Sequence, residues 1–178
     1  MKLLTGIALL LLIAPGASAQ HFPENPVPKN ETPTIREIRH ELLMLPNFGV
    51  FDNIYYDFHD GVVTLNGQVV DPALKPEAER EMNQIAGVKS VINHIEVLPP
   101  SSADASLRMA AFRAIYQYPG LEKYELGLRK PIRIIVKNRN VTLEGFVDSE
   151  PDRELAGVQA RQAQGVRSLT NNLQVVQP

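Results

Sequence analysis

The hydrophobic and polar positions of the 178-residue chain form two successive patterns of the same kind. Apolar residues that recur every three to four positions predict a helix, and alternating apolar residues predict a strand. The first pattern predicts a helix, two strands, a helix and a strand over residues 34–45, 54–58, 62–69, 74–86 and 88–98. The second predicts the same order over 107–118, 132–136, 141–147, the stretch from Glu150 to Gly165, and 166–176. We therefore expect an α+β fold with two tandem α-β-β-α-β domains, each a three-stranded sheet packed against two helices.

The two patterns are copies of one unit. Residues 63–69 (VTLNGQV) match 141–147 (VTLEGFV), and 87–90 (GVKS) match 165–168 (GVRS). Both pairs are separated by 78 residues, and 12 of the 38 positions from 60 to 97 are identical at that separation. A constant separation without gaps predicts an internal duplication.

Two pairs of glycines recur in the copies, and we expect structural roles for all four. Gly87 and Gly165 follow the predicted second helices, where a residue in the left-handed conformation commonly ends a helix. Gly67 and Gly145 lie inside strand patterns, which indicates a bulge or a close approach of the backbone to a helix.

Finer signals mark the ends of single elements. Either Thr32, before Pro33, or Thr34 is expected to cap the first helix, with residues 34–37 (TIRE) as a capping box. Alternation in the last strand of the first copy predicts one face made of Val91, Asn93, Ile95 and Val97. The order of the strands in each sheet stays open, because a β-α-β crossover sets the direction of the last strand without fixing its neighbour.

The first 19 residues have the features of a secretory signal peptide. Lys2 precedes an unbroken apolar run over 7–13, and residues 17–19 (ASA) form a cleavage signal. Cleavage after Ala19 would start the mature chain at Gln20. The alternative is a membrane anchor, for which the run is short. No Cys follows the run, so we expect a periplasmic or secreted protein that is not a lipoprotein.

Proline-rich stretches divide the rest of the chain. Residues 20–33 are expected to be a tether and residues 99–104 a linker, because each proline removes a backbone donor and favours extended conformations. The predicted domains then span residues 34–98 and 105–178.

The composition and motifs argue against several classes of function. The net charge of −2 gives no basic excess for nucleic acid, and the chain has no cysteine. The histidines lack metal-ligand spacing and have no counterparts in the second copy: His21, His40, His59 and His94. No nucleophile, phosphate-binding or dinucleotide motif occurs. We therefore expect a binding protein rather than an enzyme, with no cofactor, no metal and no nucleic acid.

The first helix of the second copy has an apolar stripe that the first copy lacks. The stripe consists of Met109, Phe112 and Tyr116, whose aligned residues in the first copy are Arg36, Arg39 and Leu43. Nearby stand Arg113, Leu121, Lys123 and Tyr124. Apolar side chains flanked by cations can enter a lipid headgroup region, so these residues are the candidate lipid- or partner-binding surface. The alternative is that the stripe packs against the first domain.

Residues 34–176 resemble two BON domains in tandem. The resemblance rests on Val-Thr-Leu-x-Gly-x-Val at 63–69 and 141–147, on the Gly-Val-x-Ser segments, and on Asn93 and Asn171. It is weaker in the first copy, where Pro72 and Pro76 interrupt the start of the second helix. The resemblance implies a mixed three-stranded sheet in an α/β sandwich and a role in the bacterial envelope. It also implies attachment to phospholipid or partner proteins, and it brings no catalytic residues.

Two functions are compatible with these features. The leading hypothesis is an exported envelope module that attaches to phospholipid membrane surfaces through its second domain. The alternative is a protein–protein adaptor that docks on an envelope partner such as a channel, a secretin or a cell-wall enzyme. A hydrolase would need convergent titratable groups, which the sequence does not indicate. The lipid, the partner and the oligomeric state are left open.

Overall fold

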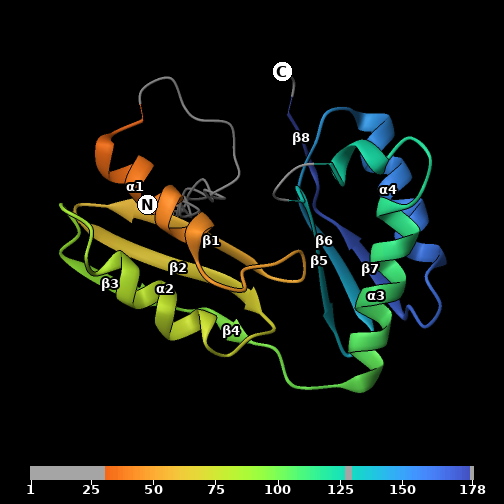
Figure 1. Cartoon of the computed structure of the whole chain (residues 1–178), viewed down its shortest axis with the longest axis horizontal. Helices are drawn as coiled ribbons and strands as arrows, with labels where there is room; N and C mark the ends of the chain where they lie inside the picture. The colour runs from red at the N-terminus through yellow and green to blue at the C-terminus, as the bar shows by residue number, and fades with distance from the viewer. Residues whose placement is uncertain (1–30, 127–129, 177–178) are drawn as a thin grey trace, which may run out of the picture.

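The computed structural model describes residues 31–126 and 130–176 (Figure 1). The predicted signal peptide and nearly all of the predicted tether lie outside these residues. In the first copy the elements are α1 (Pro33–Met44), β1 (Asn53–His59), β2 (Val62–Val69), α2 (Leu74–Met82), β3 (Ser90–Asn93) and β4 (Glu96–Val97). In the second they are α3 (Ser102–Tyr116), the 3-10 helix η1 (Glu122–Tyr124), β5 (Ile132–Lys137), β6 (Asn140–Val147), α4 (Glu150–Gln162), β7 (Ser168–Asn171) and β8 (Gln174–Val175). The predicted α+β fold in two repeated halves is confirmed.

Both sheets have the same topology, which resolves the order that the sequence left open. β2 lies in the centre, antiparallel to β1 and parallel to β3 and β4. In the second copy β6 takes the central place, between β5 on one side and β7 and β8 on the other. Each sheet is therefore three strands wide, and its last strand is divided into two short pieces.

An asparagine divides the last strand in each copy. Asn93 donates from its amide to the carbonyl oxygen of Lys75 on α2 (2.8 Å), and its side-chain oxygen accepts from the amide of Ile95 (3.1 Å). Asn171 makes the same two bonds, to the carbonyl of Arg153 and from the amide of Leu173. The break shifts the alternation, so Val97 is exposed while Leu98 is buried, and the single face predicted through Val97 is wrong.

Several helix ends differ from the prediction by a few residues. Thr32 is the N-cap of α1, because its hydroxyl accepts from the amide of Ile35 (3.3 Å), whereas the Thr34 hydroxyl donates to the carbonyl of Ala86. α3 begins inside the predicted linker, capped by the Ser101 hydroxyl. Serine and threonine favour such positions because their hydroxyl satisfies an amide that the helix leaves unpaired.

The repeated glycines occupy positions that exclude a side chain. A Cβ on Gly67 or Gly145 would lie 1.9 Å from the carbonyl oxygen of Asn53 or Pro131, so the close approach is to the neighbouring strand and not to a helix. Gly87 and Gly165 have φ of +94° and +102° and lie in turns beyond the helix ends, not at the helix C-caps themselves.

Each domain has its own core on one face of its sheet. In the first copy α1 and α2 cover β1 and β2 through residues such as Ile38, Leu42, Ala78 and Met82. In the second copy α3 and α4 cover β5 and β6 through residues such as Leu107, Ile115 and Ala156. Figure 1 shows the second sheet between its own helices and the first domain. Within residues 31–126 and 130–176, no helix combines the length and apolar character that a membrane crossing requires.

Candidate binding surface and domain interface

The structure divides the predicted apolar stripe of α3 among three environments. Met109 is 44% exposed, Phe112 is half-buried, and Tyr116 is fully buried. Arg113, one turn after Met109, is exposed. The surface part of the stripe is therefore the pair Met109 and Arg113, with Phe112 at its edge.

Tyr116 belongs to the core of the second domain and not to its surface. Its hydroxyl donates to the carbonyl oxygen of Ile132 (2.7 Å) and accepts from the amide of the same residue (3.0 Å). Burial raises the pKa of the Tyr116 phenol well above its usual value, so the group stays protonated and able to donate. Tyr116 thus connects the end of α3 to the start of the edge strand β5.

The predicted residues after α3 form a structural cluster around η1. Leu121 and Tyr124 are buried, while Lys123 is exposed. Asp152, in the first turn of α4, accepts from Lys123 (2.9 Å) and from the Tyr124 hydroxyl (2.7 Å). The hydrogen bonds to Asp152 and Asp148 raise the pKa of Lys123 above its usual value. Because two carboxylates already compensate its charge, Lys123 contributes little free positive charge to a binding surface.

Phe112 contacts the first domain. Its ring meets the ring of Phe51 edge to face, with 6.2 Å between centroids and 70° between planes. The Lys130 ammonium lies 5.9 Å from the centroid of the Phe112 ring on the second domain's side. For this residue the structure favours the alternative that the stripe packs against the first domain.

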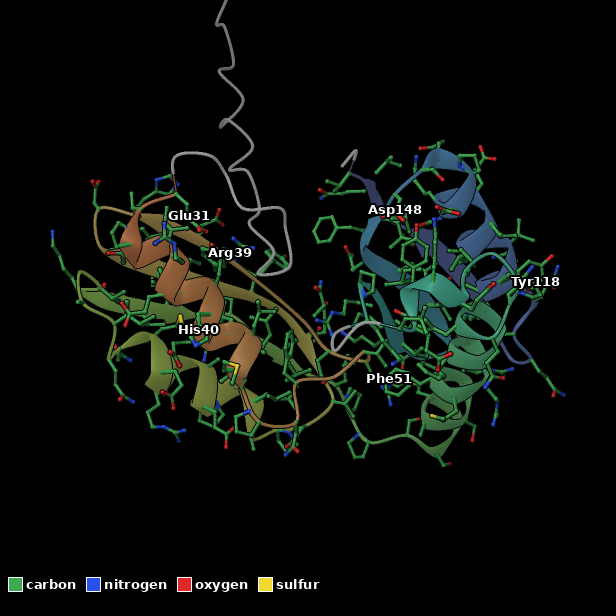
Figure 2. All side chains as sticks on the ribbon, turned by 45° about the horizontal axis from the view of Figure 1, so that its top comes forward. Glu31, Arg39, His40, Phe51, Tyr118 and Asp148 are labelled. Atoms are coloured by element: carbon green, nitrogen blue, oxygen red, sulfur yellow. The ribbon has the colours of Figure 1, made fainter. Side chains whose placement is uncertain are left out.

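Phe51 lies on a loop, residues 47–52, that reaches from the first domain to β5 (Figure 2). The carbonyl of Val50 accepts from the amide of Ile134 (2.9 Å), and the carbonyl of Gly49 accepts from the guanidinium of Arg133 (2.7 Å). This loop therefore covers part of the outer edge of β5, which a sheet would otherwise present unpaired. We name residues 47–52 the docking loop.

Arg133 and Asp52 are buried polar residues that hold the docking loop. Arg133 is 3% exposed and lies over the ring of Phe48 (4.7 Å to the centroid); burial lowers the pKa of its guanidinium to about 10. The Asp52 carboxylate accepts from the amides of Gly49 (2.9 Å) and Val70 (2.7 Å), and burial raises its pKa despite these bonds. The sequence analysis missed both residues; an Arg within the run Ile132–Val136 was the available signal.

Replacing Phe51 with alanine should loosen the docking loop. Aromatic pairs contribute about 0.5–1.5 kcal/mol beyond the area they bury, so the amide of Ile134 should lose at least several-fold of its protection from hydrogen exchange. Amide exchange measured by NMR reports this directly. Tyr118→Ala, which removes an aromatic ring that is 39% exposed, is the control. Unchanged protection at Ile134 would show that the loop docks without Phe51.

The equivalent face of α1 is polar and ion-paired. Glu31 accepts from Arg39 (2.9 Å) and lies 3.8 Å from Arg36, the two residues aligned with Phe112 and Met109. Figure 2 shows Glu31 and Arg39 together on the first domain, away from the second. The copies have thus diverged at the same helical positions, one toward ion pairs and the other toward apolar contact.

The described residues contain no cluster of three or more His, Cys, Asp or Glu side chains that could hold a metal ion. His40 is on α1, His59 at the end of β1 and His94 between β3 and β4, so three of the four histidines lie apart in the fold. The fourth, His21, lies outside the described residues.

These features define a class of protein, a tandem pair of small α+β domains joined by an apolar and hydrogen-bonded interface. The BON domain family model matches residues 30–99 and 123–177, which include most of both copies. The chain therefore belongs to the BON domain family, a family of binding domains rather than enzymes. The resemblance seen in the sequence is confirmed.

Other comparisons add little. Comparison with curated proteins gave no match. Among solved structures, the chain is similar to CdsD, described as a structural protein of the type III secretion system of Chlamydia trachomatis, at 13% identity over 81% of this chain and 92% of that one, with a TM-score of 0.30. The C-terminal domain of CdsD matches at 12% identity over 83% and 99%, also with a TM-score of 0.30. Scores this low carry no argument about function.

Proposed function

We propose that this protein is an exported module of the bacterial envelope that binds anionic phospholipid surfaces through the outer face of α3. Export is supported by the apolar run 7–13 and the cleavage signal at 17–19. BON domain proteins are typically associated with the periplasm or the envelope, which agrees with such a location.

The observation that carries the proposal is the exposed Met109 beside Arg113 on α3. A partly exposed apolar side chain next to a cation suits the boundary between headgroups and acyl chains, where the methionine enters the apolar layer and the guanidinium meets a phosphate. The half-buried Lys130, beside Phe112, adds a second cation near this face. The aligned face of α1 has ion pairs in place of these groups.

Flotation with vesicles tests the proposal. The chain from residue 20 onward should bind phosphatidylglycerol-containing vesicles, bind phosphatidylcholine vesicles weakly, and lose binding as salt rises. Met109→Ser with Arg113→Ser should weaken the anionic binding about tenfold or more, because an arginine near such a surface contributes about 1 kcal/mol and a buried methionine about 1.5–3 kcal/mol.

A matched control exists in the first domain. Met44 is 61% exposed at the end of α1, so Met44→Ser removes an exposed methionine from the corresponding helix of the other copy. This variant should bind vesicles as the wild-type chain does. Equal binding by the Met109/Arg113 double variant would remove α3 as the membrane contact.

The joined pair of domains favours a second candidate, an adaptor that docks on an envelope protein. The docking loop, together with the 2.6 Å ion pair between Lys137 and Glu96, connects the copies at separate points. A pair held in this way can present one continuous surface to a protein partner. Such an adaptor would not float with vesicles of either composition.

A further inference from the structure

A polar cleft lies between the two domains, away from α3. Its volume is about 410 Å³, within the range of small-molecule sites. Gln68 contributes from β2 of the first domain, and the remaining lining comes from the open face of the second sheet and its hairpin turn: Ile135, Lys137, Asn138, Asn140, Thr142 and Glu144. The cleft exists only because the docking loop holds the domains together.

The lining is rich in neutral groups that both donate and accept hydrogen bonds. Gln68 and Asn138 have side-chain amides and Thr142 has a hydroxyl, and no hydrogen bond within residues 31–126 and 130–176 is recorded for these three side chains. Buried or half-buried polar groups normally have partners, so groups of this kind in a cleft are available to a ligand.

The charges in the cleft disfavour an anionic ligand. Lys137 is paired with Glu96 across the domain interface at 2.6 Å. Glu144 accepts from the amide of Asn172 (2.7 Å), and its burial raises the pKa of the carboxyl. An anion would therefore meet a carboxylate and a lysine that is already neutralised.

We propose that this cleft binds a neutral polyhydroxylated ligand, a short segment of oligosaccharide. Amide and hydroxyl side chains suit sugar hydroxyls, which also donate and accept, and the Glu144 carboxylate can accept from a pair of them. Ile135, on the floor of the cleft, supplies an apolar surface for the face of a sugar ring. The second sheet presents these groups in register, because Thr142 and Glu144 alternate on one face of β6.

Titration with a soluble N-acetylglucosamine tetrasaccharide, and separately with maltotetraose, tests the proposal on the chain from residue 20 onward. At millimolar sugar, the side-chain amide signals of Gln68 and Asn138 should shift in ¹H–¹⁵N spectra and saturate. Gln68→Ala with Thr142→Val should weaken binding about tenfold, since each lost hydrogen bond costs a few-fold in affinity.

Two control variants make the result specific. Thr64 occupies the position 78 residues before Thr142, on the first sheet and outside the lining, so Thr64→Val should leave the affinity unchanged. Glu144→Gln keeps the shape and should keep sugar binding within a few-fold, whereas a cation would lose its ligand. Absence of shifts with both sugars, or binding that Gln68→Ala with Thr142→Val leaves intact, would overturn the proposal. Vesicle binding through α3 is read out separately and does not depend on this result.

Discussion

Replacing Gly145 with alanine should destabilise the second domain by about 3 kcal/mol or more, because two independent costs combine. Gly145 has φ of +102°, a conformation that costs L-residues about 1–2 kcal/mol. The new Cβ would also lie 1.9 Å from the carbonyl oxygen of Pro131, a backbone atom that cannot rotate away. Overpacking of this kind typically costs a further 1–3 kcal/mol.

Urea unfolding followed by circular dichroism measures the effect, and Gly120 provides the matched control. Gly120 also has positive φ, +96°, but its nearest neighbour for a Cβ is a side-chain atom of Leu155 at 3.9 Å. Gly120→Ala therefore reports the conformational cost alone, about 1 kcal/mol. Gly145→Ala should exceed Gly120→Ala by at least 1 kcal/mol. If the two variants are equally stable, β5 and β6 do not need the close approach that the structure shows.

The duplicated fold was predictable because its signals are local. The hairpins at 59–62 and 137–140 have positive φ at Asp60, Gly61, Asn138 and Arg139, and the patterns on either side alternate as strands do. The constant separation of 78 residues then transfers each assignment from one copy to the other. Asn93 and Asn171 also recur at this separation, yet a strand pattern alone does not reveal that an asparagine breaks the strand to hold a helix.

The domain interface could not be predicted, because it depends on contacts distant in sequence. The docking loop is 84 residues from its partner in the hydrogen bond between Gly49 and Arg133. In the sequence it is a connection between a helix and a strand, and connections usually lie on the surface. Burial of Arg133 on the open face of the second sheet becomes understandable only when a second domain covers that face.

The candidate surface on α3 was predicted only in part for a related reason. Met109 and Tyr116 are seven residues apart and lie on nearly the same face of the helix, since a helix has 3.6 residues per turn. What covers that face changes along its length. The chain after α3 folds back over its C-terminal end, burying Tyr116 and Leu121, while Met109 remains exposed. A helical pattern identifies a face, and tertiary structure decides which part of it meets solvent.

Tyr116→Ala should therefore unfold the second domain rather than remove a lipid contact. Loss of a buried aromatic ring costs about 3–5 kcal/mol, a large part of the stability of a small domain. Tyr116→Phe keeps the ring and removes only the hydroxyl, which leaves the amide and carbonyl of Ile132 without this partner. Each unsatisfied group costs about 1–3 kcal/mol, so we expect a loss of about 2 kcal/mol or more.

Thermal unfolding of both variants tests this role, with Tyr118→Phe as the control, because Tyr118 is 39% exposed one turn away. The control should unfold at the wild-type temperature, whereas Tyr116→Phe should unfold several degrees lower. At temperatures where Tyr116→Phe remains folded, its vesicle binding should equal that of the wild-type chain, since the hydroxyl lies in the core. A stable Tyr116→Phe that loses vesicle binding would instead place this hydroxyl at the membrane surface and contradict its position in the structure.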